Sequence, residues 1–203
     1  MANLKLKNPS GGSLNLVSAD GASDLTVTFP AGTGTAVVNG VSSSIVSGTA
    51  VASTSGTSID FTGIPSWAKR VTVMLNGVSW NNTVSPLIQL GDSGGVETTG
   101  YSSIASNVST AANVGANAET TGFGFQSGWT ADVLFTGSII FSLLDVSTNT
   151  WVAQGMFYAD SSTTDYVVSI AGRKSLSATL DRVRITSSAA ITFDAGTINI
   201  LYE

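Results

Sequence analysis

The chain of 203 residues contains no histidine and no cysteine, and only 10% of its residues are charged. Without imidazole it lacks the usual general base near neutral pH and a common metal ligand. Without thiols it has no cysteine nucleophile, no thiolate zinc site and no disulfide. These absences exclude most catalytic chemistry and favour a protein that holds its shape and contacts other molecules. We therefore expect no enzymatic activity, no cofactor and no metal site.

Positive charge and long apolar runs are also scarce. The formal net charge is −5 and the sequence pI is about 4.5, which argues against a nucleic-acid partner. No run approaches the roughly 20 apolar residues of a membrane span, so we expect no membrane insertion. The N-terminus lacks the apolar core of a signal peptide. The sequence thus predicts a protein that is made in the cytoplasm and not exported by a general secretory route.

Three zones can be separated along the chain. Residues 1–36 carry short runs of alternating apolar and polar residues. This zone is too small to bury its own apolar stripe, so it is expected to dock on another surface. Residues 37–57 are rich in serine, threonine and small residues, and fit either a flexible linker or an extended, partly packed connector. Residues 58–203 show repeated short strands without a helical period. This zone predicts an all-β, antiparallel β-sandwich that resembles a jelly roll.

Local signals refine this prediction for residues 58–203. Asn76-Gly77 is the strongest two-residue hairpin signal, and it predicts that residues 78–80 return along the strand before it. Residues 147–150 predict a second hairpin loop, between the apolar runs 131–146 and 151–159. Residues 93–127 are rich in glycine, alanine, serine and threonine, and we expect a long excursion of loops there.

The motif GDSGG at residues 91–95 resembles the string around the nucleophile of trypsin-like serine proteases. In that resemblance Ser93 would attack a carbonyl, but the chemistry needs a histidine base that this chain lacks. We interpret the motif as a turn. Paired carboxylates can hydrolyse glycosides without histidine, but the acidic residues of this sequence are mostly isolated in predicted turns.

Aromatic residues provide the candidate binding site. Exposed aromatic rings stack on sugars and anchor protein interfaces, whereas the alternative for each ring is packing in the core or at a subunit seam. Trp80 lies beside two asparagines and Trp129 lies in a glycine-rich run, which favours exposure of both. Together with Tyr101 they are the predicted receptor-binding residues.

Several segments resemble fibre proteins of tailed bacteriophages. Residues 25–38, LTVTFPAGTGTAVV, are similar to a segment that recurs in tail fibres and related fibres. Residues 59–65, 70–73, 87–92 and 194–203 are similar to a domain that ends many phage and prophage fibre proteins. The resemblance covers most of the chain except the connector and the central loops.

This resemblance implies a homotrimeric virion protein of the tail-fibre or head-fibre type, with residues 1–36 attached to other virion proteins of the capsid, tail or baseplate. The expected function of the C-terminal domain is host-surface adhesion, by binding polysaccharide. A second expectation is a capsid or baseplate decoration with a purely structural role, and a third is a polysaccharide depolymerase. Glycan binding separates the first from the second, and polymer cleavage identifies the third.

Overall fold

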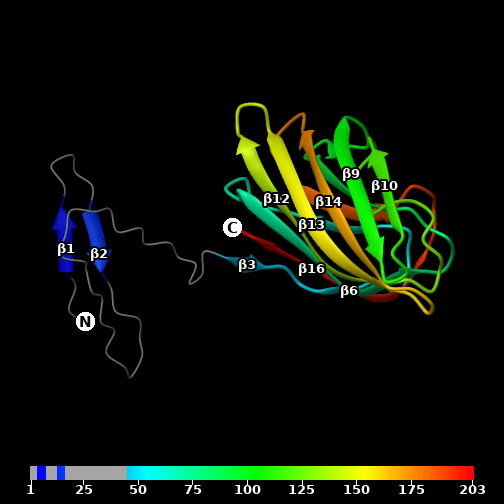
Figure 1. Cartoon of the computed structure of the whole chain (residues 1–203). Coiled ribbons are helices and arrows are strands. Elements are labelled where there is room, and N and C mark those ends of the chain that lie inside the picture. The colour runs from blue at the N-terminus through cyan, green and yellow to red at the C-terminus, as the bar shows by residue number, and fades with distance from the viewer. Residues whose placement is uncertain (1–3, 8–12, 17–44) are drawn as a thin grey trace, which may run out of the picture. The chain divides into compact units, whose positions relative to one another are not determined.

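The computed structural model of the chain describes residues 4–7, 13–16 and 45–203, and it divides the chain into two units, 1–42 and 43–203. In the first unit, β1 (Leu4–Lys7) pairs antiparallel with β2 (Ser13–Leu16) (Figure 1). The register places Leu4 opposite Leu16 and Leu6 opposite Leu14. The run predicted over residues 25–29 and the first residues of the connector lie outside the described residues.

The second unit contains a nine-stranded antiparallel sheet (Figure 1). From one edge to the other its strands are β10 (Val114–Glu119), β9 (Tyr101–Ser109), β14 (Tyr166–Ser175), β13 (Thr150–Asp160), β12 (Leu134–Asp145), β6 (Arg70–Trp80), β16 (Phe193–Tyr202) and β3 (Val46–Ser47), while β4 (Val51–Ala52) pairs with β16. β12 and β13 pair across the loop that the sequence predicted at residues 147–150, so this hairpin is confirmed.

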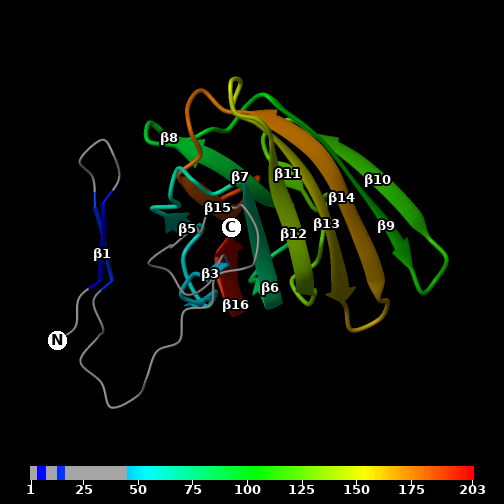
Figure 2. The same ribbon diagram turned by 90° about the vertical axis from the view of Figure 1, so that its left-hand side faces the viewer.

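A smaller, five-stranded antiparallel sheet completes the unit. Its strands in order are β11 (Phe123–Gly124), β7 (Pro86–Asp92), β15 (Arg182–Ser187) and β5 (Ile59–Thr62), with β8 (Gly95–Val96) pairing with β7. Figure 2 shows β7 and β15 of this sheet beside the curved larger sheet. The predicted all-β antiparallel sandwich is confirmed. None of the described residues forms a helix that is long and apolar enough to cross a membrane.

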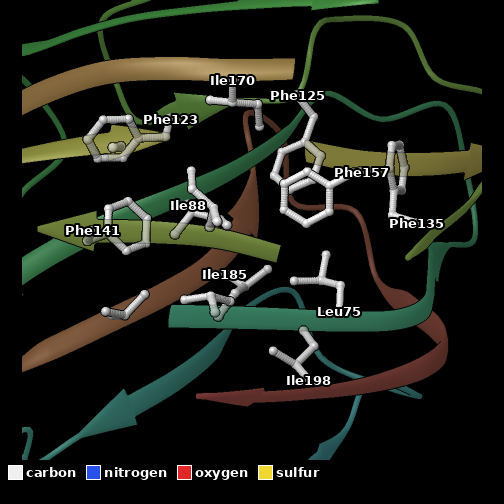
Figure 3. Packing of buried hydrophobic residues seen from close by; sticks show 14 of the residues in the cluster. Leu75, Ile88, Phe123, Phe125, Phe135, Phe141, Phe157, Ile170, Ile185 and Ile198 are labelled. Atoms are coloured by element: carbon white, nitrogen blue, oxygen red, sulfur yellow. The ribbon is translucent and has the colours of Figure 1, made fainter. Parts of the chain in front are cut away.

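The core lies between the two sheets and is rich in phenylalanine (Figure 3). Phe125 packs against Phe157 with ring centroids 4.5 Å apart, and Phe123 packs against Phe141 at 5.1 Å. Side chains alternate between the two faces of a strand. In β13, Trp151, Ala153, Phe157 and Ala159 therefore point into the core while the intervening residues are largely exposed. The other face of the larger sheet is thus open to solvent.

The hairpin predicted at Asn76-Gly77 is wrong. β6 continues through these two residues and pairs with β12 on one side and β16 on the other. Gly77 has a φ of 61°, and the registers of both neighbouring strands shift at this position. The glycine therefore supplies a β-bulge instead of a turn, since a left-handed residue fits either feature.

The prediction of a long loop excursion over residues 93–127 is also wrong, because β8, β9, β10 and β11 lie within it. β9 alternates regularly between buried and exposed residues, but several of its buried positions are polar. One of them, Ser103, donates a hydrogen bond to the Gly122 carbonyl at 2.9 Å. Hydroxyls that are satisfied in this way hide the hydropathy pattern of a strand.

The described part of the connector, residues 45–57, is packed against the sandwich. β3 and β4 both pair with β16. The side chain of Ser53 is fully buried and donates a hydrogen bond to the Ala195 carbonyl at 2.7 Å. For these residues the structure favours the packed connector over the flexible linker, and the sandwich unit begins near residue 43 instead of residue 58.

Candidate binding surface

The expected exposure of the aromatic candidates is wrong. Trp80 is 1% exposed, Tyr101 4% and Trp129 6%. Trp80 ends β6 and packs on Phe135 and Phe193, with ring centroids 6.1 and 4.7 Å away. A ring enclosed in this way cannot stack on a sugar in solution. The polar neighbours in the sequence that suggested exposure of Trp80 belong to the turn that follows it.

Tyr101 is buried beneath charged residues at one end of the sandwich. Its hydroxyl donates a hydrogen bond to the Glu97 carbonyl at 2.8 Å and accepts one from the Leu90 amide at 2.8 Å. The ammonium of Lys174 lies 5.4 Å from the centre of its ring. Burial raises the pKa of the Tyr101 hydroxyl far above its ordinary value, so the side chain stays neutral. Its role in the fold is structural.

Trp129 connects the core to an exposed aromatic residue. Its indole nitrogen donates a hydrogen bond to the Phe125 carbonyl at 3.2 Å. Its ring meets Phe135 on one side and Tyr166 on another, with centroids 5.3 and 5.0 Å away. Tyr166 is half-buried and lines a surface depression, so Trp129 supports that depression from beneath.

This depression is the candidate binding site. It has a volume of about 360 Å³ and opens where β9 ends and β14 begins, at the end of the sheet toward which the β9 arrow points in Figure 1. Its lining consists of Val108, Ser109, Thr110, Tyr158, Asp165, Tyr166 and Val167. We call this site the Tyr158 depression.

Tyr158 is the most exposed aromatic side chain of the depression. It points outward from β13 and is 44% exposed. The strand registers place it in a row with Val167 of β14, Val108 of β9 and Val114 of β10, all of which are exposed. The ring therefore lies beside an apolar strip that crosses neighbouring strands, a suitable surface for the C–H face of a ligand.

The two loops that border the depression are bound to each other. The Thr110 amide donates to the Asp165 carbonyl at 2.9 Å, and the Asp165 amide donates to the Thr110 hydroxyl at 3.3 Å. In the adjacent strands, Ser109 and Tyr166 are paired in register. These bonds fix the Asp165 backbone beside Tyr158, so the depression is formed before any ligand binds.

Carboxylates dominate the electrostatics of this end of the sandwich. Partial removal from water raises the pKa of Tyr158, and hydrogen bonds to Asp165 and Asp160 raise it further. Asp132 accepts hydrogen bonds from Thr130 and from the amide and hydroxyl of Ser162, which hold its pKa well below the usual range. No lysine or arginine is among the residues that line the Tyr158 depression.

The structure brings together two acidic residues that the sequence left isolated. Asp160 ends β13 and Asp165 precedes β14, and both interact with the hydroxyl of Tyr158. Among the described residues, no group of three or more acidic, histidine or cysteine side chains could hold a metal ion. The site therefore offers two tyrosine rings, an apolar strip, one carboxylate and hydroxyl groups.

Ser93 of the GDSGG motif is exposed and forms, with Gly94, the turn of the hairpin between β7 and β8. Asp92 is buried beneath this turn, where it accepts hydrogen bonds from the Gly94 amide at 2.8 Å and the Ser177 hydroxyl at 2.6 Å. These bonds hold the pKa of Asp92 below its usual value. The motif thus stabilises a tight turn.

A second exposed aromatic residue, Trp67, lies elsewhere on the sandwich and packs on Tyr202 with centroids 5.7 Å apart. A depression of about 430 Å³ is lined by Lys69, Arg70, Ser142 and Glu203. Its arginine and glutamate form an ion pair, so their charges are satisfied within the protein.

The chain matches no model of a known protein family, no curated protein and no solved structure. The fold and the site define it as an antiparallel β-sandwich with an open, tyrosine-lined depression on its larger sheet.

Proposed function

We propose that this chain is a non-enzymatic fibre or spike protein of a bacteriophage virion that adheres to polysaccharide on the host surface. The resemblance of residues 25–38 and of the C-terminal segments to phage fibres supports the virion part of the proposal. The observation that carries the binding part is the exposed Tyr158 ring beside the Asp165 carboxylate, in a depression that is formed without a ligand.

Such a depression fits the chemistry of a sugar. The C–H face of a pyranose ring packs on an aromatic ring, and the valines of the adjacent strip extend this apolar contact. Carboxylate oxygens accept hydrogen bonds from sugar hydroxyls, and serine and threonine hydroxyls can either donate or accept. Asp165, Ser109 and Thr110 supply these groups around Tyr158.

The surrounding sheet face also suits a hydroxyl-rich polymer. The outward positions of β10, β9, β14 and β13 carry small, hydroxyl-bearing and apolar side chains and the neutral amide of Gln154, with charge only at Arg173 near one end and Asp160 at the other. An extended polymer can cross such a face without removing charged groups from water, which would oppose binding.

The test compares three variants of the full chain for binding to bacterial cells and to a glycan array. Tyr158→Ala is expected to weaken binding about 10-fold or more, as the loss of an aromatic contact commonly does. Tyr158→Phe keeps the ring and is expected to retain most of the binding. Val152→Ala is the matched control, because Val152 is an exposed residue on the same strand and the same face.

Thermal unfolding and light scattering on each variant complete this test. If Tyr158→Ala reduces adhesion without changing stability or mass, the ring contacts the ligand. If it instead changes the oligomeric state, this face is a subunit contact and the adhesion site is wrong. Failure of the unmodified chain to bind any cell or glycan, while it still joins particles, supports the decoration role instead.

The depolymerase alternative has a direct assay at the same site. Asp160 and Asp165 are the acidic pair that the structure places around a candidate sugar site. Glycoside hydrolysis needs such a pair to act as acid and as base or nucleophile. Under our proposal, incubation with a bound polymer releases no new reducing ends, and their appearance would overturn the non-enzymatic assignment.

A further inference from the structure

The charges of the sandwich are segregated by position, and this restricts the ligand of the Tyr158 depression. Asp160 and Asp165 both reach the Tyr158 hydroxyl. Asp132 joins the same end through its hydrogen bonds to Ser161 and Ser162, in the loop between β13 and β14. None of these three carboxylates forms an ion pair within residues 45–203.

The positive charges of the sandwich lie elsewhere. Arg70, Lys174, Arg182 and Arg184 are each paired with a carboxylate. Lys69 is exposed, but it lies beside Leu143, at the end of β12 away from Asp160. Arg173 is exposed on the same sheet face as Tyr158, but it lies at the far end of β14. The six steps of strand from Val167, which is paired with Tyr158, to Arg173 span about 20 Å at roughly 3.3 Å per residue, about two Debye lengths at 0.1 M salt. Arg173 therefore cannot neutralise an anion bound beside Tyr158.

Asp165 is the one charged residue in the lining of the depression. The Asp165 carboxylate can only accept while it is ionised. Partial removal from water and the nearby carboxylates of Asp165 and Asp160 raise the pKa of the Tyr158 hydroxyl, so it stays neutral. A ligand group that bonds to the Asp165 carboxylate must therefore donate, through a hydroxyl or ammonium group. A carboxylate or sulfate on the ligand cannot donate, and it would face like charge.

We infer that the Tyr158 depression selects sugars without negative charge, neutral hexoses or amino sugars, and discriminates against uronic acids and other anionic glycans. This inference rests on the proposed function, because it names the class of glycan that the same site binds. The apolar strip and the polar groups of the lining provide the contact with the sugar. The Asp165 carboxylate and the absence of a nearby cation disfavour an anionic sugar.

The experiment uses the full chain and matched sets of methyl glycosides in the gluco, galacto and manno series. Each set contains a hexose, the corresponding hexuronate and the corresponding hexosamine, so that the ring is constant and the charge changes. Binding is followed by saturation-transfer NMR, which observes the sugar and detects weak complexes. At low salt the hexose is expected to bind about 5-fold more tightly than the uronate, as one unscreened like-charge contact in water implies.

The variant Asp165→Asn removes one negative charge and keeps the size of the side chain. It is expected to narrow the preference for hexose over uronate, and raised salt is expected to do the same. Asp145→Asn is the matched control, because Asp145 is an exposed aspartate that ends β12, at the end of the strand away from Asp160. That variant is expected to keep the full preference.

The outcomes separate this inference from the proposed function. Uronate binding that equals or exceeds hexose binding, and that is lost in Tyr158→Ala, would overturn the charge selectivity and leave adhesion intact. Cell binding that depends on Tyr158 without binding of any sugar in the sets would show that the ligand is of another class. If neither cells nor sugars bind, the adhesion proposal itself is wrong.

Discussion

At the scale of single residues, two of the three buried tryptophans, Trp80 and Trp129, differ in one hydrogen bond. The indole nitrogen of Trp129 donates to the Phe125 carbonyl, whereas that of Trp80 has no partner among the described residues. Replacing either with phenylalanine removes similar volume from the core. We expect Trp129→Phe to lower the free energy of unfolding about 1 kcal/mol more than Trp80→Phe does, because it also leaves a buried acceptor unpaired. Urea denaturation measures the free energy of unfolding of both variants.

The same pair tests whether Trp129 supports the surface site. Its ring contacts Tyr166, which lines the Tyr158 depression, and the ring of Trp80 contacts neither tyrosine. Sugar binding is therefore expected to weaken more in Trp129→Phe than in Trp80→Phe. Equal effects of the two changes on stability and on binding would contradict the assigned contacts.

Glu97 and Lys174 form the most enclosed ion pair of the sandwich, with the lysine side chain 5% exposed. Burial alone would raise the pKa of Glu97, but hydrogen bonds from Lys174 and Ser177 outweigh it and lower the pKa. The unfolded chain therefore binds this proton more readily than the folded chain. The stability that Glu97 contributes is complete above about pH 5 and is lost as the pH falls through the lowered pKa.

Glu97→Gln is accordingly expected to lower the free energy of unfolding by about 1.5–3 kcal/mol at pH 7, since it removes charged hydrogen bonds. The difference from the unmodified chain should shrink as the pH falls from 5 to 3 in a series of urea titrations. Glu203→Gln is the control, because its pair with Arg70 is more exposed and worth about 0–1 kcal/mol. A difference that grows at low pH would contradict the assignment.

At the scale of elements, the bulge between β6 and β16 depends on two facing glycines. Gly196 has a φ of 99°, and a Cβ atom there would lie 2.4 Å from the Gly77 carbonyl oxygen. Gly77 has a φ of 61°, but a Cβ atom there would meet nothing within 4 Å. Gly77→Ala is thus expected to cost about 1–2 kcal/mol of backbone strain, and Gly196→Ala about 1–3 kcal/mol more through its clash with backbone.

Thermal unfolding of the two variants decides this prediction, and the order of their midpoints matters more than the size of either shift. If Gly77→Ala proves the more damaging, the bulge is not built as described. This pair also explains the false hairpin signal. A glycine with positive φ marks a departure from regular pairing, but the sequence does not reveal whether strands continue on both sides of it.

The sequence predicted the fold class because apolar alternation in β6, β12, β13 and β15 is strong. It failed over β9 and β10, where buried positions carry serine or asparagine and outward positions carry alanine or valine. In these strands the pattern of hydrophobicity is weak, and the buried hydroxyl of Ser103 donates its hydrogen bond to Gly122, 19 positions away. The partner of Ser103 is too distant in the chain to be read from local spacing.

The candidate site was missed for a related reason. Trp80 and Trp129 were judged by their polar neighbours in the chain, whereas burial depends on which face of a strand a residue occupies. The alternation of Trp151, Ala153 and Phe157 already places Tyr158 on the opposite, outward face of β13. That signal was present in the sequence. The proximity of Asp165 was not, because it depends on the pairing of β13 with β14 and β9.

At the scale of the whole molecule, we expect the paired strands β1 and β2 to dock on another surface. A two-stranded sheet is marginally stable by itself in water, and this one pairs leucine with leucine at two positions of its register. The resemblance to phage fibres implies that copies of the chain supply this partner as a homotrimer. A shallow site such as the Tyr158 depression also gains from repetition, because linked sites can raise avidity about 10²–10⁴-fold over a single site.

We therefore expect sedimentation of the full chain to report a multiple of 20.6 kDa, with three copies preferred. Tyr158→Ala should leave this mass unchanged, since we propose that the ring contacts a ligand and not a neighbouring subunit. Attachment to cells should be at least about 100-fold tighter than binding of a single oligosaccharide, by the avidity argument. A monomer at micromolar concentration would contradict self-association, and equal cell and oligosaccharide affinities would show that the copies do not engage the surface together.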